Sequence, residues 1–245
     1  MSARVFVDVP VLCGHRGSGR GVNDGYAENT LGSFRAAVAS GLRWVEVDAR
    51  LTADGVLVAR HDAVVDDGRY VSELTAEETD ALGLMRVADL LEDLPRDVGV
   101  DVDLKTSLED AHRPRGETTA ALVADLVARE GDRRQLLVTS FDPAALLIMR
   151  ERAPAVPIGL LTWIRFPLRK AIPAAVHLGA DVIAPHVESF GLRSDTPRRG
   201  ERAIAESVRA AHDAGLQVVA WCPIREERDE LVAAGVDCLV IDDVL

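Results

Sequence analysis

Acidic side chains alternate with aliphatic ones in two segments of the chain. Glu46 and Asp48 occupy alternate positions of the first segment; Asp101 and Asp103 do so in the second, followed by Lys105. Alternate residues of a β-strand point to one face, so these acids would face each other. Three carboxylates about 5 Å apart repel by about 3 kcal/mol per pair at an effective dielectric constant of 20. A divalent cation removes that repulsion, and all-oxygen ligation favours Mg²⁺ or Ca²⁺. The alternative is an internal salt-bridge network with Lys105 and arginines.

Two histidines lie at the ends of apolar runs that are expected to form strands. His15 ends the first such run and is followed by Arg16, and His61 ends a later one. Imidazole gains and loses a proton near neutral pH, so the pair can act as general acid and general base. Arg16 and Lys105 add positive charge for a phosphate, the first through its planar fork and the second as a point charge.

The elements that must position these residues follow from a recurring pattern. An apolar helix end, a glycine and a β-branched run occur together around Gly41, Gly179, Gly215 and Gly235. Glycine just past a helix adopts the left-handed turn at low cost, and near-continuous apolar strands are typical of a buried parallel sheet. The pattern therefore predicts an α/β chain.

Eight core strands are expected, over residues 11–15, 44–49, 99–105, 136–141, 157–162, 181–186, 217–222 and 237–242. Helical patterns lie near 30–40, 86–94, 117–130, 143–152, 168–178, 201–214 and 226–234. Eight strand–helix units in a chain of this length predict a TIM (β/α)8 barrel, whose active site lies at the carboxyl ends of the strands. An open doubly wound sheet is the alternative.

A further apolar run, 56–61, follows the preceding strand too closely for a parallel crossover, which needs a dozen or more residues. It is therefore expected to return antiparallel as a hairpin. Its register would place His61 opposite Glu46, or opposite Asp48 after a slip of two residues. Residues 62–85, weakly periodic and rich in acids, predict a short insertion over the barrel mouth.

Composition limits the partners and the location of the chain. Its 245 residues are 48% hydrophobic and carry a net charge of −12, which suits a single domain over 1–245 and disfavours binding to nucleic acid or to an anionic membrane. No apolar run is long enough to span a bilayer, and residues 1–10 lack a signal-peptide core. We expect a cytoplasmic protein without stable membrane association.

The end of the barrel pattern is incomplete. After the last predicted strand only 243–245 follow, so the closing helix is expected to be missing or truncated. The strand surface that this helix would cover is expected to be buried by the N-terminal segment or by a second subunit, which would make a homodimer.

Taken in order, these motifs resemble the glycerophosphodiester phosphodiesterase family. The resemblance runs from about residue 11 to 243. It is carried by His15-Arg16-Gly17, Glu28-Asn29-Thr30, Glu46-Val47-Asp48, His61-Asp62, Asp103-Leu104-Lys105, Ser140-Phe141, Trp221 and the segment 236–242. Several such motifs in one order are specific, whereas one tripeptide alone is not.

The resemblance implies metal-dependent hydrolysis of a small-molecule glycerophosphodiester to glycerol 3-phosphate and an alcohol. The residues it implies are His15 and His61 as the acid/base pair, Glu46, Asp48 and Asp103 as ligands of one Mg²⁺ or Ca²⁺, Arg16 and Lys105 on the phosphate, Trp221 in the substrate pocket, and Glu28 and Asn29 bracing the site by hydrogen bonds.

Departures from the family keep two other functions open. Asp103 replaces a glutamate that is usual in the family, which shortens that ligand by one methylene. The insertion after His61 is short, so the substrate size typical of the family cannot be assumed for this chain. The alternatives are a lysophospholipase D acting on monoacyl phospholipids and a non-catalytic barrel that binds phosphate ligands.

Overall fold

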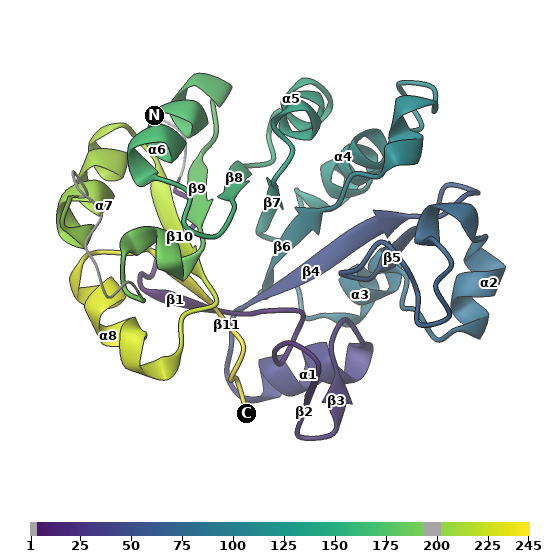
Figure 1. The fold of residues 1–245 in the computed structure, drawn as a ribbon. Coiled ribbons are helices and arrows are strands. Elements are labelled where there is room, and N and C mark those ends of the chain that lie inside the picture. The colour runs from purple at the N-terminus through teal and green to yellow at the C-terminus, as the bar shows by residue number, and fades with distance from the viewer. Residues whose placement is uncertain (1–3, 194–201) are drawn as a thin grey trace.

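A closed parallel barrel forms the centre of the molecule in the computed structural model, which describes residues 4–193 and 202–245 (Figure 1). Its strands are β1 (Val11–Gly14), β4 (Trp44–Leu51), β6 (Gly99–Leu104), β7 (Leu136–Ser140), β8 (Ile158–Thr162), β9 (Val182–Pro185), β10 (Gln217–Trp221) and β11 (Cys238–Ile241). Because β1 pairs in parallel with both β4 and β11, the sheet closes on itself. The TIM barrel prediction is confirmed, and the open sheet is excluded.

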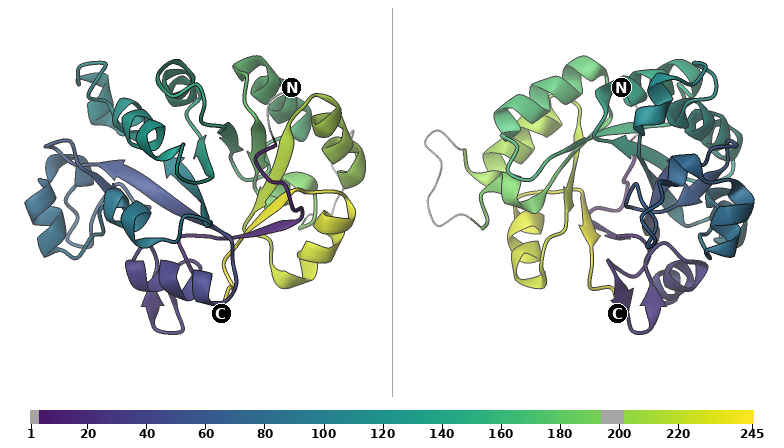
Figure 2. Two further views of the ribbon diagram at one scale, coloured as in Figure 1. Left: turned by 180° about the vertical axis from the view of Figure 1, so that it is seen from behind. Right: turned by 45° about the vertical axis from the view of Figure 1, so that its right-hand side comes forward.

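Helices cover the outside of the barrel (Figure 2). They are α1 (Leu31–Ala39), α3 (Val87–Asp93), α4 (Thr119–Glu130), α5 (Pro143–Arg152), α6 (Leu168–Leu178), α7 (Ile204–Asp213) and α8 (Arg225–Ala233). Each lies within a few residues of its prediction, although residue 201, the expected start of one helix, falls outside the described residues. Side-chain caps explain several starts, such as Asp142, which accepts a hydrogen bond from the Ala144 N–H ahead of Pro143.

The hairpin strand β5 (Leu57–Ala59) pairs antiparallel with β4, but neither predicted register is correct. Leu51 lies opposite Leu57, midway between the two registers considered. The Thr52 hydroxyl accepts from the Val56 N–H at 2.9 Å, so the turn begins at Thr52 and shifts the pairing by one residue. The shift places Arg60, rather than His61, beside Asp48, and the Arg60 N–H donates to the Asp48 carbonyl at 3.2 Å.

The segment 62–85 packs beside the hairpin (Figure 1). It contains the short turn η1 (Val71–Glu73) and helix α2 (Ala76–Ala81), and its apolar side chains form a small cluster with Val58 of β5. Of the described residues that line the central pocket, none comes from 62–85. That this segment covers the mouth, and that 1–245 form a single domain, stay predictions.

The N-terminal segment closes the bottom of the barrel instead of covering its last strand. Val5 and Phe6 are buried among barrel-interior side chains, and the Phe6 ring meets Trp44 edge-on with centroids 5.0 Å apart. The Gln217 side-chain oxygen accepts from both backbone N–H groups, at 2.7 and 3.0 Å. The prediction that this segment buries the place of the closing helix is therefore wrong, because the interior offers its apolar residues a better-enclosed site. As expected, no helix follows β11 among the described residues.

Gly99 allows this lower layer to pack. It lies opposite Trp44 in the β4–β6 pairing, and a Cβ at Gly99 would stand 2.4 Å from the indole ring. We expect Gly99→Ala to lower the free energy of unfolding by about 1–3 kcal/mol, because the ring cannot move without displacing Phe6. Urea unfolding measures the change. Gly116→Ala is the control, since nothing lies within 4 Å of the Cβ it would add, and an equal loss in both variants would contradict the prediction.

Candidate active site

A pocket of about 710 Å³ opens at the carboxyl ends of the barrel strands. It is lined by most of the predicted site residues: His15, Arg16, Glu46, His61, Asp103, Lys105 and Trp221. Asp48 lies beneath them and is only 1% exposed. Barrel closure thus brings together residues of β4, β6 and β10 with residues that lie one or two positions beyond β1, β5 and β6.

The acidic cluster consists of Glu46, Asp48 and Asp103, each of which offers an oxygen within 4.8 Å of the others. Asp48 and Asp103 are direct neighbours in the β4–β6 pairing. Glu46 Oε1 and Asp103 Oδ1 are buried and have no hydrogen-bond partner among the residues described. Buried, unpartnered carboxylate oxygens that converge in this way fit a hard divalent cation. Asp101 is outside the cluster and accepts from the Thr139 hydroxyl at 2.9 Å.

The pKa values of the three acids shift in different directions. Burial raises the pKa of Glu46 well above its usual range, and repulsion from Asp48 and Asp103 adds to this effect. Burial also raises the pKa of Asp103, although Lys105 opposes it. At Asp48 burial is outweighed by Lys105 and Arg16, which lower its pKa to about 2. The cluster therefore holds three ionised carboxylates only at a cost that an added cation would relieve.

Two fixed cations lie against the acids. Lys105 Nζ is 3.0 Å from Asp48 Oδ1 and also donates to Asp103. Arg16 Nε is 3.2 Å from Asp48 Oδ2, and its Nη1 donates to Glu28 at 2.9 Å. The salt-bridge network considered from the sequence is thus present, yet it leaves the buried oxygens of Glu46 and Asp103 unpartnered. The salt bridges are therefore observed, and the cation site stays a prediction that these unpartnered oxygens fit.

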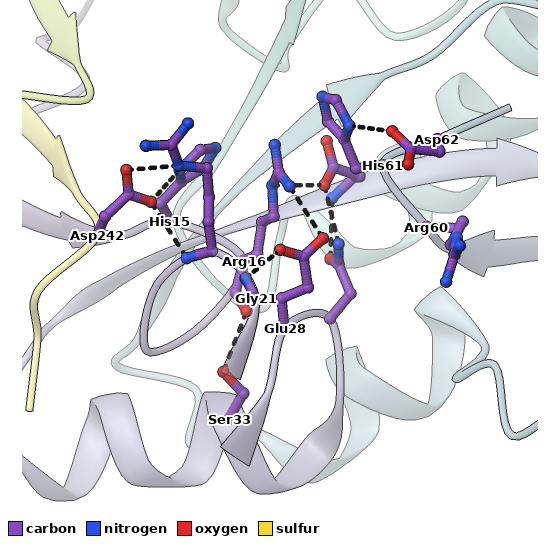
Figure 3. A network of polar contacts seen from close by, with 12 residues as sticks. His15, Arg16, Gly21, Glu28, Ser33, Arg60, His61, Asp62 and Asp242 are labelled. Atoms are coloured by element: carbon purple, nitrogen blue, oxygen red, sulfur yellow. Dashed lines mark hydrogen bonds and ion pairs between the residues drawn. The ribbon is translucent and has the colours of Figure 1, made fainter. Parts of the chain in front are cut away.

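Each imidazole is held by a carboxylate on its Nδ1 (Figure 3). His15 Nδ1 lies 2.7 Å from Asp242 Oδ1, and its Nε2 is 3.8 Å from Glu46 Oε2. His61 Nδ1 lies 2.8 Å from Asp62 Oδ1. Burial lowers the pKa of His61, although the Asp48 charge opposes it. In both rings these carboxylate contacts involve Nδ1 and not Nε2.

The two residues predicted to brace the site, Glu28 and Asn29, each contact one of its charged side chains. The Asn29 amide donates to Asp48 Oδ2 at 2.8 Å, and Glu28 pairs with Arg16. Glu28 also accepts from the Gly21 N–H, which ties it to the loop over 18–27 (Figure 3). That loop contains a small antiparallel sheet of β2 (Val22–Asn23) and β3 (Tyr26–Ala27).

Three residues of the site were not assigned a role from the sequence. Asp242 and Asp62 hold the imidazoles, and the Arg50 guanidinium donates to the His61 carbonyl at 2.9 Å. Asp62 adjoins His61 in the His61-Asp62 motif, so its contact with the imidazole could have been predicted from the sequence. Asp242 is 227 residues from His15, and only the closed barrel brings the two together.

Aromatic rings form one wall of the pocket. Phe141 stacks on Trp163 with centroids 4.4 Å apart, and Trp221 meets Phe141 edge-on at 5.9 Å. The Trp221 N–H donates to the Ala184 carbonyl at 3.2 Å, which fixes the indole at the pocket edge. Trp163 is 66% exposed. This wall can pack against the apolar parts of a substrate.

Taken together, the pocket has the components needed to hydrolyse a phosphate ester. Carboxylates that could bind a divalent cation lie beside an arginine and a lysine that could bind a phosphate, and two imidazoles could transfer protons to and from the reacting oxygens.

Within the described part of the chain, no helix is both long and apolar enough to cross a membrane.

Comparison with known proteins agrees with this chemistry. The model of the glycerophosphoryl diester phosphodiesterase family matches residues 15–245, and the chain belongs to that family. A glycerophosphodiester phosphodiesterase of Caldanaerobacter subterraneus subsp. tengcongensis is 25% identical over 254 residues, which cover 95% of this chain and 94% of the relative. The chain is therefore a hydrolase of the phosphodiesterase class.

Solved structures share the fold. Glycerophosphodiester phosphodiesterase from Thermotoga maritima superposes with a TM-score of 0.72 at 20% identity, over 96% of this chain and 95% of the other. An Oleispira antarctica phosphodiesterase, solved in complex with its product sn-glycerol-3-phosphate, gives a TM-score of 0.71 at 22% identity, over 95% and 93% of the two chains.

Proposed function

We propose that this chain hydrolyses glycerophosphodiesters to glycerol 3-phosphate and an alcohol, in a reaction that depends on one divalent cation and on two histidines. The observation that carries the proposal is the convergence of the acidic cluster, both imidazoles and both cations on one pocket. Membership of the family supports it, and so does the product held by the Oleispira antarctica relative.

The residues that would hold the cation are Glu46, Asp48 and Asp103, and their oxygen donors suit Mg²⁺ or Ca²⁺. When bound, the cation would supply Lewis acidity toward the phosphoryl oxygens. The buried, unpartnered oxygens of Glu46 and Asp103 support this assignment.

The chain's own residues would divide the remaining work. Arg16 and Lys105 would bind the phosphate, and the Trp221 indole would pack against the substrate. One imidazole would take a proton from the attacking oxygen at its Nε2, and the other would deliver a proton to the leaving alkoxide from its Nε2. Glu28 and Asn29 would keep Arg16 and Asp48 in place.

A coupled assay tests this proposal. Release of glycerol 3-phosphate is followed over a panel of glycerophosphodiesters with different alcohols, after chelation and again with Mg²⁺ or Ca²⁺ added back. We expect turnover to be lost on chelation and restored by a cation. Full turnover after chelation would contradict cation dependence, and tight binding of substrates without turnover under any condition would favour the non-catalytic binding barrel.

Cation binding is also expected to stabilise the fold. A cation at 100 times its dissociation constant contributes about 2.7 kcal/mol, which raises the melting temperature of a domain this size by roughly 5–10 °C. Scanning calorimetry with and without Mg²⁺ or Ca²⁺ measures the shift. Asp103→Asn should abolish most of it, whereas Asp101→Asn should keep it, because Asp101 is outside the cluster. Equal shifts in both variants would place the cation elsewhere.

One observation favours lysophospholipase D activity as a second candidate. An apolar groove of about 510 Å³ between α5 and α6 shares Phe141, Pro143, Leu161 and Trp163 with the catalytic pocket. The acyl chain of a lysophospholipid could extend from the pocket past Trp163 and bind in this groove. Release of choline from lysophosphatidylcholine but not from glycerophosphocholine would establish this activity in place of the first.

We propose a homodimer in which a second copy covers the outer face of β1. Leu12 of β1 is 39% exposed, whereas its pairing partner Leu239 is buried. A second copy covering this face would bury Leu12. Sedimentation equilibrium should show a dimer that Leu12→Glu dissociates, and a monomer at all concentrations would contradict it.

A further inference from the structure

The residue that follows the final strand of the barrel places a carboxylate against His15, on the Nδ1 side of the ring. Gly14 of β1 pairs with Ile241 of β11, so the next residues, His15 and Asp242, leave the two strands side by side. The His15 N–H donates to the Ile241 carbonyl at 3.0 Å, which locks this step of the ladder. The two side chains then meet, with Nδ1 of the imidazole 2.7 Å from Oδ1 of the carboxylate.

A second set of contacts also holds the carboxylate. Arg20 Nε lies 2.8 Å from Asp242 Oδ2, and the Arg20 N–H donates to Oδ1 at 3.2 Å. Gly19, with φ of +125°, lies so close that a Cβ there would stand 1.8 Å from the Asp242 carbonyl oxygen. Both carboxylate oxygens are therefore occupied, and the loop that follows His15 holds Asp242 against rotation.

We propose that Asp242 is a positioning residue that fixes the tautomer and the ring orientation of His15, an inference that rests on the proposed function. A carboxylate only accepts hydrogen bonds, so Nδ1 is the donor in the 2.7 Å contact, and the ring is held with Nε2 turned toward Glu46. The same carboxylate stabilises the imidazolium that forms when Nε2 takes a proton.

The other imidazole lacks an equally enclosed partner. The Asp62 side chain is 65% exposed, against 25% for Asp242, and the His61 side chain is 41% exposed, against 11% for His15. A hydrogen bond in water contributes less than one that is shielded from it. The larger kinetic effect is thus expected at Asp242. Hydrogen bonding and charge from His15 and Arg20 outweigh burial and hold the Asp242 pKa below its usual value, which keeps the acceptor ionised.

Steady-state kinetics of Asp242→Asn provide the first test. We expect kcat to fall about 10- to 100-fold, less than the ~10⁴ lost when the triad aspartate of a serine protease is changed to Asn, because Asp242 is not fully buried. KM should change by less than about threefold, because Asp242 does not bind the phosphate. Asp243→Asn is the matched control, since that neighbouring acid pairs with Arg225 and Arg228 away from His15.

A double-mutant cycle separates positioning from a general structural role. In a His15→Ala background, adding Asp242→Asn should lower kcat by less than about twofold, since there is no ring left to position. A similar loss in both backgrounds would overturn the proposal, and so would an Asp242→Asn enzyme with wild-type kcat.

A readout that needs no turnover keeps this inference separate from the proposed function. Long-range ¹H–¹⁵N spectra report which ring nitrogen carries the proton, and the resonances of His15 are assigned by their loss in His15→Ala. We expect a protonated Nδ1 in the wild type and a changed tautomer population in Asp242→Asn. A protonated Nε2 in the neutral wild-type ring would overturn the positioning role, even if glycerophosphodiesters proved not to be substrates.

Discussion

Replacing His61 by alanine is expected to lower kcat by about 10²- to 10⁴-fold, and His15→Ala should fall in the same range. Each ring has one nitrogen bound to a carboxylate, so each offers a single nitrogen to the reacting oxygens. Alanine removes that nitrogen and leaves the acids and cations of the pocket in place. Initial rates of glycerol 3-phosphate release under saturating cation measure the loss.

The control is His112→Ala, because His112 is exposed in a loop outside the pocket. Its rate should match that of the wild type. A substrate with a p-nitrophenol leaving group further separates the two roles, because this alcohol leaves without being protonated. The variant that lacks the general acid should lose much less rate on that substrate than on an alkyl ester. Near-full turnover in both His15→Ala and His61→Ala would contradict the two-histidine mechanism.

Much of this pocket could be predicted because its signals are local. Acids at alternate positions identify Glu46, Asp48 and Asp103 as facing one way, since a strand repeats every two residues. The glycine at each helix end locates the next strand, and strand ends in a parallel barrel share one rim. His15 and Lys105 were therefore placed at the mouth by strand geometry alone.

The contacts that escaped prediction are set by long-range geometry. Asp242 meets His15 only because the first and last strands pair, which no local pattern specifies. The hairpin register was missed by one residue because it depends on the Thr52 hydroxyl, a single side-chain hydrogen bond within the turn. The N-terminal segment was expected to cover the outside of the last strand, yet Val5 and Phe6 are buried in the interior at the base of the barrel.

Lys105→Met is expected to destabilise the cation-free protein by about 3–5 kcal/mol. Lys105 is 11% exposed and is the ammonium that pairs with both Asp48 and Asp103, so its removal leaves two buried carboxylates sharing less positive charge. Its own pKa is raised, because these two acids outweigh the effect of burial. Urea unfolding after chelation measures the loss, with Lys170→Met, an exposed lysine of α6, as the control.

Saturating Mg²⁺ or Ca²⁺ should restore part of this stability, because a cation held by the acidic cluster would supply the positive charge that the variant lacks. Activity should not recover in parallel, since Lys105 would also bind the phosphate. Stability and turnover are therefore expected to separate in this one variant. If the added cation does not change the stability loss, Lys105 alone balances the charge of these acids. That result would contradict the assignment of the cation site to the acidic cluster.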